Sequence, residues 1–294
     1  MKLSIVIPIM NQHQLTVDCL KLIEKNAIDI DELIIVDNSD IDFLSFKPLQ
    51  EIDSRLLNRL RVIRNKENAG VRESLNQGFK NSDGDVVLFM HNDLMIYEKG
   101  FDFKIKESFK NDEVGALGAF GAKGLGLSNI YLDNYEMCQL ARIGNISNAR
   151  MDKHIHGFRN LRNEFENVAV FDGMFMCIRR KLLDKINGFD PITETFHNYD
   201  NLICIKSIQN GYENIVISLD VSHLGGVTTV KENWSEKFGK TKQKVHEDAH
   251  PPLYNYGRGF LPVMIEDIYD DKGEKIIGYN LYSDRKLIKT KIYD

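Results

Sequence analysis

Short apolar runs that alternate with helical patterns constrain the fold of this chain more than any other feature. Four such runs lie in the first third of the sequence, at residues 3–9, 32–36, 60–64 and 85–90. The first run, LSIVIPI, is rich in β-branched residues, which is typical of a strand buried on both faces. Helical periodicity follows it at residues 17–23 and precedes the fourth run at residues 70–79. This alternation predicts a mostly parallel α/β sheet that is flanked by helices.

The composition limits the classes of partner. The chain has 294 residues, of which 43% are hydrophobic, and this is enough for one large domain or for a domain with an appendage. Lys and Arg number 38 against 43 Asp and Glu, so the net charge is -5. This balance argues against nucleic acid as the main partner, because surfaces that bind a phosphate backbone are usually basic.

The cysteines and the N-terminus bear on the expected location. The four cysteines are far apart and have no metal-ligand spacing, so we expect reduced thiols in a cytosolic protein. No signal peptide precedes the first predicted strand, and no apolar run approaches the roughly 20 residues of a membrane span. We therefore expect a soluble cytoplasmic protein. Peripheral attachment to the inner face of a membrane and the oligomeric state are left open.

Polar side chains collect where the predicted strands end. Asn11, Asp37, Asn68 and Asp93 lie at or just after these ends. Ligands of parallel sheets bind beyond the carboxyl ends of the strands, so these side chains predict a binding site. The segment FMHND, which ends the fourth run with a histidine, an amide and a carboxylate, is part of the same pattern. Taken alone, it is equally well explained as a polar strand end followed by a turn.

The second half of the chain has a less regular pattern. Periodicity is lost over residues 118–166, where glycines are crowded, and this predicts an irregular and functional excursion. Strand and helix patterns return over residues 168–219. We predict one domain over residues 1–226 and a helical and strand extension over residues 227–294, with a role at the acceptor side or in oligomerisation.

The order of the motifs resembles that of the family-2 inverting glycosyltransferases, which have a GT-A fold. The resemblance covers residues 1–226 and is carried by these stretches: SIVIP with Asn11, VDNS at 36–39, NAGVR at 68–72, NQG at 76–78, GDVVLFMHND at 84–93, FDG at 171–173, GFD at 188–190, Tyr199-Asp200 and HLGG at 223–226. It implies a Rossmann-like, mostly parallel sheet flanked by helices, with a small C-terminal appendage. Residues 1–226 would then form the nucleotide-sugar-binding and catalytic domain.

The resemblance implies a divalent cation, Mn²⁺ or Mg²⁺, at the end of the fourth strand. In the family, an Asp-x-Asp motif at this place holds a cation that bridges the diphosphate of a sugar nucleotide. Here His91 replaces the first acid and Asp93 stands at the second, while His223 matches a family histidine that contacts the metal or the diphosphate. Such a cation acts as a Lewis acid on the leaving diphosphate, and hard cations accept one carboxylate together with substrate oxygens.

The same resemblance implies the residues that bind the nucleotide sugar. Asp37 would accept the N3–H of a pyrimidine base, and Arg72, on the first turn of a helix, would contact the diphosphate. The other candidates of this predicted site are Pro8, Asn11, Asn68 and Asn92. As alternatives, Asp37 forms an Asx turn at a strand end, and Arg72 is a surface arginine.

Asp200 is the predicted general base. In an inverting transferase one carboxylate takes the proton from the acceptor hydroxyl as its oxygen attacks the anomeric carbon. Asp200 also begins a predicted helix, where Asp is a preferred N-cap, and the two roles are compatible. A helix start lowers the pKa of a carboxylate, so basicity requires desolvation.

Together these residues predict transfer of a sugar from a UDP- or TDP-sugar to a hydroxyl of a glycan, a lipid-linked sugar or a protein. A non-catalytic scaffold that binds a nucleotide or a glycan is one alternative. A sugar nucleotidyltransferase is another, but such enzymes need a Gly-rich phosphate loop after the first strand, and residues 8–11 do not form one.

Overall fold

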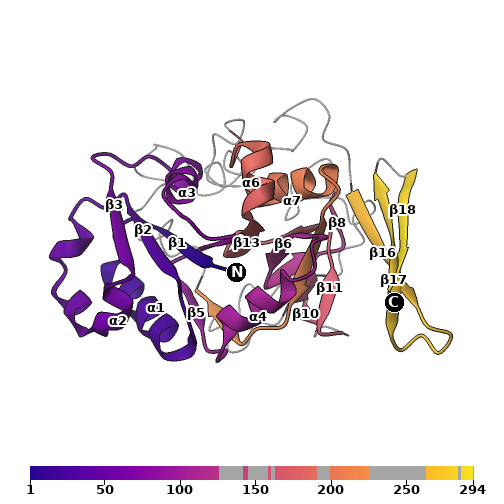
Figure 1. Cartoon of the computed structure of the whole chain (residues 1–294), viewed down its shortest axis with the longest axis horizontal. Coiled ribbons are helices and arrows are strands. Elements are labelled where there is room, and N and C mark those ends of the chain that lie inside the picture. The colour runs from indigo at the N-terminus through magenta and orange to yellow at the C-terminus, as the bar shows by residue number, and fades with distance from the viewer. Residues whose placement is uncertain are drawn as a thin grey trace, which may run out of the picture.

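The computed structural model of the chain describes residues 1–125, 142–144, 158–159, 163–190, 199–224, 263–283 and 286–293. Within these residues, an eight-stranded sheet with the order β11-β14-β6-β13-β4-β1-β2-β3 forms the centre of the molecule (Figure 1). Most of the predicted excursion at residues 118–166 and the first part of the predicted extension, residues 227–262, lie outside the described residues.

The first half of the sheet is parallel, as the sequence predicts. Its strands are β1 (Leu3–Ile9), β2 (Glu32–Asp37), β3 (Leu60–Arg64) and β4 (Val86–Met90). The register pairs Ile9 with Asp37 and Asp37 with Arg64, so the carboxyl ends of the first three strands are level. Strand β4 pairs with β1 on the side opposite to β2. The carboxyl ends of β1 and β4 therefore mark the topological switch point, beside which ligands of such sheets bind.

The second half makes the sheet mixed. Its strands are β6 (Val114–Gly118), β11 (Phe165–Asn167), β13 (Phe175–Arg179) and β14 (Glu213–Ile217). Strand β13 lies between β4 and β6 and is antiparallel to both, while β11 is antiparallel to β14. Because β13 runs against β4, its first residues lie beside the last residues of β4. This return brings the middle of the chain to the edge where the first strands end.

Helices cover both faces of the sheet. Helices α1 (His13–Asn26) and α4 (Phe101–Ser108) pack on one face, and α3 (Val71–Lys80), α6 (Arg180–Ile186) and α7 (Tyr199–Gln209) pack on the other (Figure 1). Alternate residues of β1 pack into the hydrophobic cores on the two faces of the sheet. Ile5 and Ile7 lie on the face covered by α1, and Val6 lies on the face covered by α3. A Cβ at Gly78 would lie 2.2 Å from a Val6 methyl, so only glycine lets α3 approach β1 this closely.

Short elements complete the described fold. They are η1 (Phe43–Ser45), η2 (Lys47–Glu51), α2 (Ser54–Leu57), β5 (Leu94–Ile96), β7 (Phe120–Ala122), β9 (Arg142–Gly144), β10 (Phe158–Arg159), β12 (Val170–Phe171) and β15 (Val221–His223). The pairing of β15 with β5 matters most for function, because it sets His223 opposite Leu94. His223 thereby lies beside the end of β4.

The end of the chain is joined to the sheet through buried charges. Strands β16 (Val263–Tyr269), β17 (Ile276–Ser283) and β18 (Lys286–Ile292) form a sheet whose β16 pairs with β8 (Gly124–Leu125). Lys123 Nζ lies 2.6 Å from Asp267 and 3.3 Å from Glu166, and all three side chains are buried. The predicted boundary near residue 226 stays a prediction.

The cysteines and the helices bear on the expected cellular location. Cys19, Cys177 and Cys204 are buried free thiols, and Cys138 lies outside the described residues. Among the described helices, none combines the length and the apolar character that a membrane crossing requires.

Replacing Lys123 with Met should reduce the free energy of unfolding by about 3–5 kcal/mol. The substitution keeps most of the side-chain volume but leaves the carboxylates of Glu166 and Asp267 buried without their cation. Urea unfolding measures the effect. The control is Lys110→Met, which removes an exposed pair with Glu107 and should cost no more than about 1 kcal/mol. Equal effects of the two substitutions would show that the buried cluster does not hold the C-terminal sheet.

Candidate functional site

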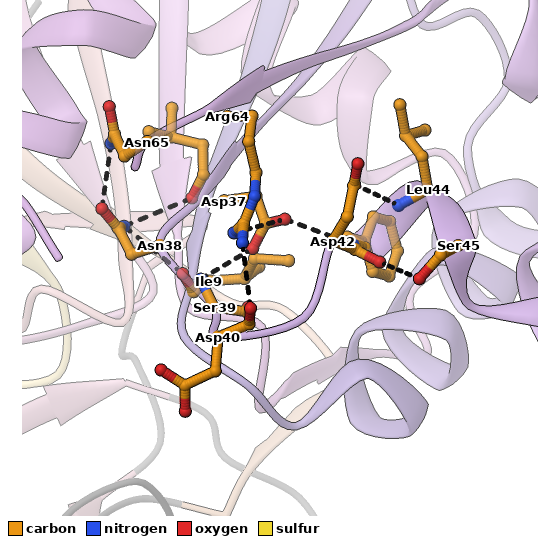
Figure 2. Close-up of polar contacts among 12 residues, drawn as sticks. Ile9, Asp37, Asn38, Ser39, Asp40, Asp42, Leu44, Ser45, Arg64 and Asn65 are labelled. Carbon is orange, nitrogen blue, oxygen red and sulfur yellow. Dashed lines mark hydrogen bonds and ion pairs between the residues drawn. The ribbon is translucent and has the colours of Figure 1, made fainter. Parts of the chain in front are cut away.

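Asn38 connects the loops that follow the first three strands of the sheet. Its amide Nδ2 donates to the carbonyl of Ile9, 3.3 Å away, and to Ser74 Oγ on α3 at 2.9 Å. Its Oδ1 accepts from Asn65 Nδ2 at 2.9 Å and from the backbone N–H of Ala69 at 3.1 Å. Figure 2 shows Asn38 beside Asn65 and close to Ile9, the last residue of β1. The walls of the predicted nucleotide site are therefore held by one buried amide.

The Asp37 carboxylate is fully engaged within the protein (Figure 2). Oδ1 accepts from the backbone N–H of Ser39, and Oδ2 accepts from that of Phe43, both at 2.9 Å. Arg64 Nη1 lies 3.1 Å from Oδ2, and the Asp37 side chain has no exposed surface. The contact with Ser39 is the Asx turn that the sequence left open. Contact between Asp37 and a base stays a prediction, and it requires Arg64 and the loop to move.

Asn11 joins the loop after β1 to the loop after β2. Its backbone N–H donates to Ser39 Oγ at 2.8 Å, its Nδ2 donates to Asp40 Oδ2 at 3.2 Å, and its Oδ1 accepts from the N–H of Asp40 at 3.1 Å. Asn11 and Gln12 both have a φ of 55°, in the left-handed region that residues other than glycine rarely adopt. The contacts of Asn11 offset this local strain.

Asn68 and Arg72 flank the N-terminus of α3. Asn68 Oδ1 accepts from the N–H of Gly70 at 2.9 Å, and Asn68 Nδ2 lies 3.1 Å from Met10 Sδ. Gly70 has a φ of 78° and turns the chain into the helix. Arg72 is the second residue of α3 and pairs with no acid among the described residues. Its guanidinium and the helix N-terminus can therefore both bind an anion.

Pro8 and Asn92 each lie against another element of the fold. Pro8 lies in β1 opposite Val36 of β2. Asn92 Nδ2 donates to Thr16 Oγ1 on α1 at 2.9 Å, so its amide faces the helix. Both residues lie at the predicted edge of the sheet, and a contact of either with a nucleotide sugar stays a prediction.

His91, Asp93 and His223 form a cluster with ligand atoms in the range of a metal site. Asp93 Oδ1 lies 3.2 Å from His223 Nε2 and 3.8 Å from His91 Nδ1, and the two imidazoles are 3.3 Å apart. Asp93 Oδ1 is buried and accepts no hydrogen bond of normal geometry. A buried carboxylate oxygen of this kind beside two imidazoles fits a divalent cation. The sequence-based expectation named Asp93 and His223, and the structure adds His91.

The charges of the cluster decide which of its groups are ready to bind a cation. Burial opposes ionisation of Asp93, but the contact with His223 and its charge outweigh burial and lower the pKa of Asp93. Burial lowers the pKa of His91, so its imidazole is neutral near pH 7, whereas at His223 burial is outweighed by the contact with Asp93, which raises the pKa of His223. Neutral imidazoles and ionised carboxylates ligate metals, so Asp93 and His91 are in their metal-binding forms and His223 releases its proton when a cation binds.

Tyr199 links the cluster to helix α7. Its hydroxyl lies 3.0 Å from His91 Nε2, the ring nitrogen that points away from His223. A Cβ at Gly173 would lie 2.6 Å from this hydroxyl, so glycine is required there. Sequence reasoning missed the role of Tyr199, because 108 residues separate it from His91 and no local pattern marks the contact.

Asp200 follows Tyr199 and is an enclosed carboxylate with unusual proton affinity. Its oxygens accept from the N–H groups of Gly173, at 2.9 Å, and Asn201, at 2.8 Å. Burial, and next the charge of Asp172, raise the pKa of Asp200 to about 7. These two effects outweigh the backbone hydrogen bonds, which lower the pKa, and burial is the desolvation that a base at a helix start requires. Asp172 has this electrostatic role although the sequence showed it only as part of a motif.

The model of Glycosyl transferase family 2 matches residues 4–187, which is more than half of the chain. No protein of curated function matches the sequence.

Two solved structures share the fold. GalNAc-T7, solved with UDP, GalNAc and Mn²⁺, has 16% identity and a TM-score of 0.57 over 76% of this chain and 43% of its own. The mannosyltransferase PcManGT from Pyrobaculum calidifontis, solved with GDP-Man and Mn²⁺, has 15% identity and a TM-score of 0.54 over 86% of this chain and 67% of its own. The chain thus spans less than half the length of GalNAc-T7. At these identities the likeness shows the fold alone, and it confirms the predicted fold class.

Replacing Asp200 with Asn should stabilise the protein above pH 7. The pKa of Asp200 is raised from 3.8 to about 7, so the protonated carboxyl stabilises the fold at low pH. This contribution is lost as the pH rises through about 7. Asn carries no charge, and its single amide oxygen keeps one of the two backbone hydrogen bonds. The lost hydrogen bond lowers the stability equally at every pH, so the dependence of the difference on pH reports the charge.

The melting temperature of the Asn variant should therefore exceed that of the wild type by ~2 °C or more at pH 8, with a smaller difference at pH 5. Differential scanning calorimetry at both pH values measures this. Asp184→Asn, at an exposed carboxylate of α6, is the control and should give no such gain. A pH-independent difference would contradict the raised pKa.

Proposed function

The chain belongs to glycosyl transferase family 2, and we propose that it transfers a sugar from a UDP- or TDP-sugar to a hydroxyl with inversion at the anomeric carbon. The acceptor is a glycan, a lipid-linked sugar or a protein. One observation carries the proposal: Asp200 and the His91–Asp93–His223 cluster lie at the same edge of the sheet and are joined through Tyr199.

Asp200 is proposed as the general base. A carboxylate with a pKa of about 7 is ionised in a large fraction of molecules near neutral pH and still binds a proton well. It takes the proton of the acceptor hydroxyl as the oxygen forms its bond to the anomeric carbon. The bond from that carbon to the diphosphate breaks in the same step, and its electron pair leaves with the nucleoside diphosphate. One displacement of this kind inverts the anomeric configuration.

The groups at the ends of β1, β3 and β4 are proposed to bind the donor. Arg72 and the N-terminal N–H groups of α3 stabilise the diphosphate; the proposal is supported by the position of Arg72 on the first turn of this helix, where an anion is favoured. Asn11 and Asn68 shape the loops around the nucleotide. Because the Asp37 carboxylate is enclosed, it contributes by holding the loop after β2 in place, and it contacts the base only if Arg64 releases it.

The His91–Asp93–His223 cluster is the proposed cation site. A bound Mn²⁺ or Mg²⁺ would neutralise the negative charge that develops on the leaving diphosphate. Asp93 would supply the carboxylate, and His223, whose Nε2 lies 3.2 Å from it, would supply an imidazole nitrogen after losing its proton. His91 completes the donor set from the same loop.

Sugar transfer is tested by a donor screen followed by product analysis. Nucleotide sugars that bind should raise the melting temperature in the presence of Mn²⁺, because ligands of the native state stabilise it. The stabilising donor is then incubated with candidate acceptors, and NMR reads the anomeric configuration of the product. Retention of the donor configuration would contradict the single displacement.

Replacing Asp200 with Asn should lower kcat by ~100-fold or more while donor affinity stays nearly unchanged, because a general base acts only in the transition state. Steady-state kinetics and calorimetric titration of the donor measure both quantities. Asp190→Asn serves as control, since the Asp190 carboxylate is paired with Lys206 at 2.7 Å. Wild-type turnover of the Asp200 variant would assign the base to another carboxylate.

Replacing Asp93 with Asn should raise the Mn²⁺ concentration for half-maximal activity by ~10-fold or more, because the cluster loses its carboxylate charge. Activity is measured against Mn²⁺ after chelation. Asp18→Asn, on the exposed side of α1, is the control and should leave this concentration unchanged. Full activity of the chelated wild type would remove the cation from the proposal.

A further inference from the structure

Three ligand atoms of the His91–Asp93–His223 cluster are spaced as ligands of one cation. Their separations are 3.3 Å between the two imidazole nitrogens and 3.2 and 3.8 Å from these nitrogens to Asp93 Oδ1. A circle through the three atoms has a radius of about 2.0 Å, which is the length of a bond between a transition cation and a nitrogen ligand, about 2.0–2.1 Å. Two of the three atoms are imidazole nitrogens.

This donor set distinguishes between cations. Mg²⁺ prefers oxygen ligands in octahedral geometry and releases its water molecules reluctantly. Imidazole suits the first-row transition cations, and the affinity of a given site rises from Mn²⁺ to Co²⁺ and is high for Zn²⁺. A carboxylate in place of His91 would give an oxygen-rich site that accepts Mg²⁺. His91 therefore changes which cations the cluster binds well.

We propose that the cluster selects first-row transition cations over Mg²⁺, with His91 as the selecting ligand and Tyr199 as the residue that positions it. The inference rests on the proposed function, since it concerns the cation site of the same donor pocket. It goes beyond that function by assigning the choice between Mn²⁺ and Mg²⁺ to one side chain.

Tyr199 determines which nitrogen of His91 faces the cluster. When Nδ1, which faces His223 and Asp93, binds the cation, the other nitrogen, Nε2, carries the proton and can donate a hydrogen bond to the Tyr199 hydroxyl 3.0 Å away. Such a second partner fixes the tautomer and the ring orientation of a metal-binding histidine. The Tyr199 side chain is itself held, because it is 5% exposed and its ring meets Phe189 edge-on at 6.3 Å.

Calorimetric titration of the metal-free full chain with Mg²⁺, Mn²⁺, Co²⁺ and Zn²⁺, without nucleotide, tests the selection. We expect Mn²⁺ to bind at least ~10-fold more tightly than Mg²⁺, and Co²⁺ and Zn²⁺ to bind more tightly than Mn²⁺. His91→Asp should lower the ratio of Co²⁺ to Mg²⁺ affinity by ~10-fold or more. Equal affinities for Mg²⁺ and Co²⁺ in the wild type would overturn the proposal, whether or not the variant folds.

Tyr199→Phe tests the positioning role. Removal of the hydroxyl should weaken Co²⁺ binding by ~10–100-fold and change the visible absorption spectrum of bound Co²⁺. The matched control is Tyr212→Phe, just beyond the other end of α7, which should leave affinity and spectrum unchanged. A wild-type spectrum and affinity in Tyr199→Phe would overturn the role of Tyr199.

The two proposals can fail separately. These titrations contain no nucleotide sugar, so an unselective cluster would leave sugar transfer as it stands. Conversely, a selective cluster in a protein that transfers no sugar would overturn the proposed function alone.

Discussion

The buried amide of Asn38 is the interaction on which the rest of the site depends. It is hydrogen-bonded to the last residue of β1, to the loop after β3 and to α3, so three segments of the chain share one side chain. Each such bond contributes about 0.5–1.5 kcal/mol net, but an unpaired buried partner costs more. The amide therefore adds to the contacts of Asn11 with Ser39 and Asp40 in fixing the strand ends relative to α3, which carries Arg72.

The antiparallel strand β13 brings residues from the second half of the chain beside the end of β4. The backbone N–H of His91 donates to the carbonyl of Met174 at 3.1 Å, which places the loop after β4 against the start of β13. The turn just before β13 carries Gly173, whose N–H donates to Asp200. A mixed sheet thus brings a histidine from the first half and a carboxylate from the second half to one edge, with Tyr199 between them.

Features that depend on neighbouring residues could be predicted from the sequence, and contacts between residues far apart in the sequence could not. The strands of the first half were predicted correctly because burial on both faces leaves a local apolar pattern. The meeting of Asp93 and His223 was expected only through the family resemblance. The Asp37–Arg64 pair, the His91–Tyr199 contact and the effect of Asp172 on Asp200 were not predicted, because side chains from distant segments leave no periodicity. The pairing of β16 with β8 was missed for the same reason.

The close approach of Gly173 to Tyr199 restricts how homologous chains can vary. Any Cβ at position 173 would lie 2.6 Å from the hydroxyl oxygen and 2.9 Å from a ring carbon of Tyr199, so the two positions are not independent. A homologue with a side chain at the first position needs a smaller residue at the second, and it then loses the hydroxyl that orients the imidazole. Glycine and tyrosine should therefore be inherited as a pair, together with histidine at position 91.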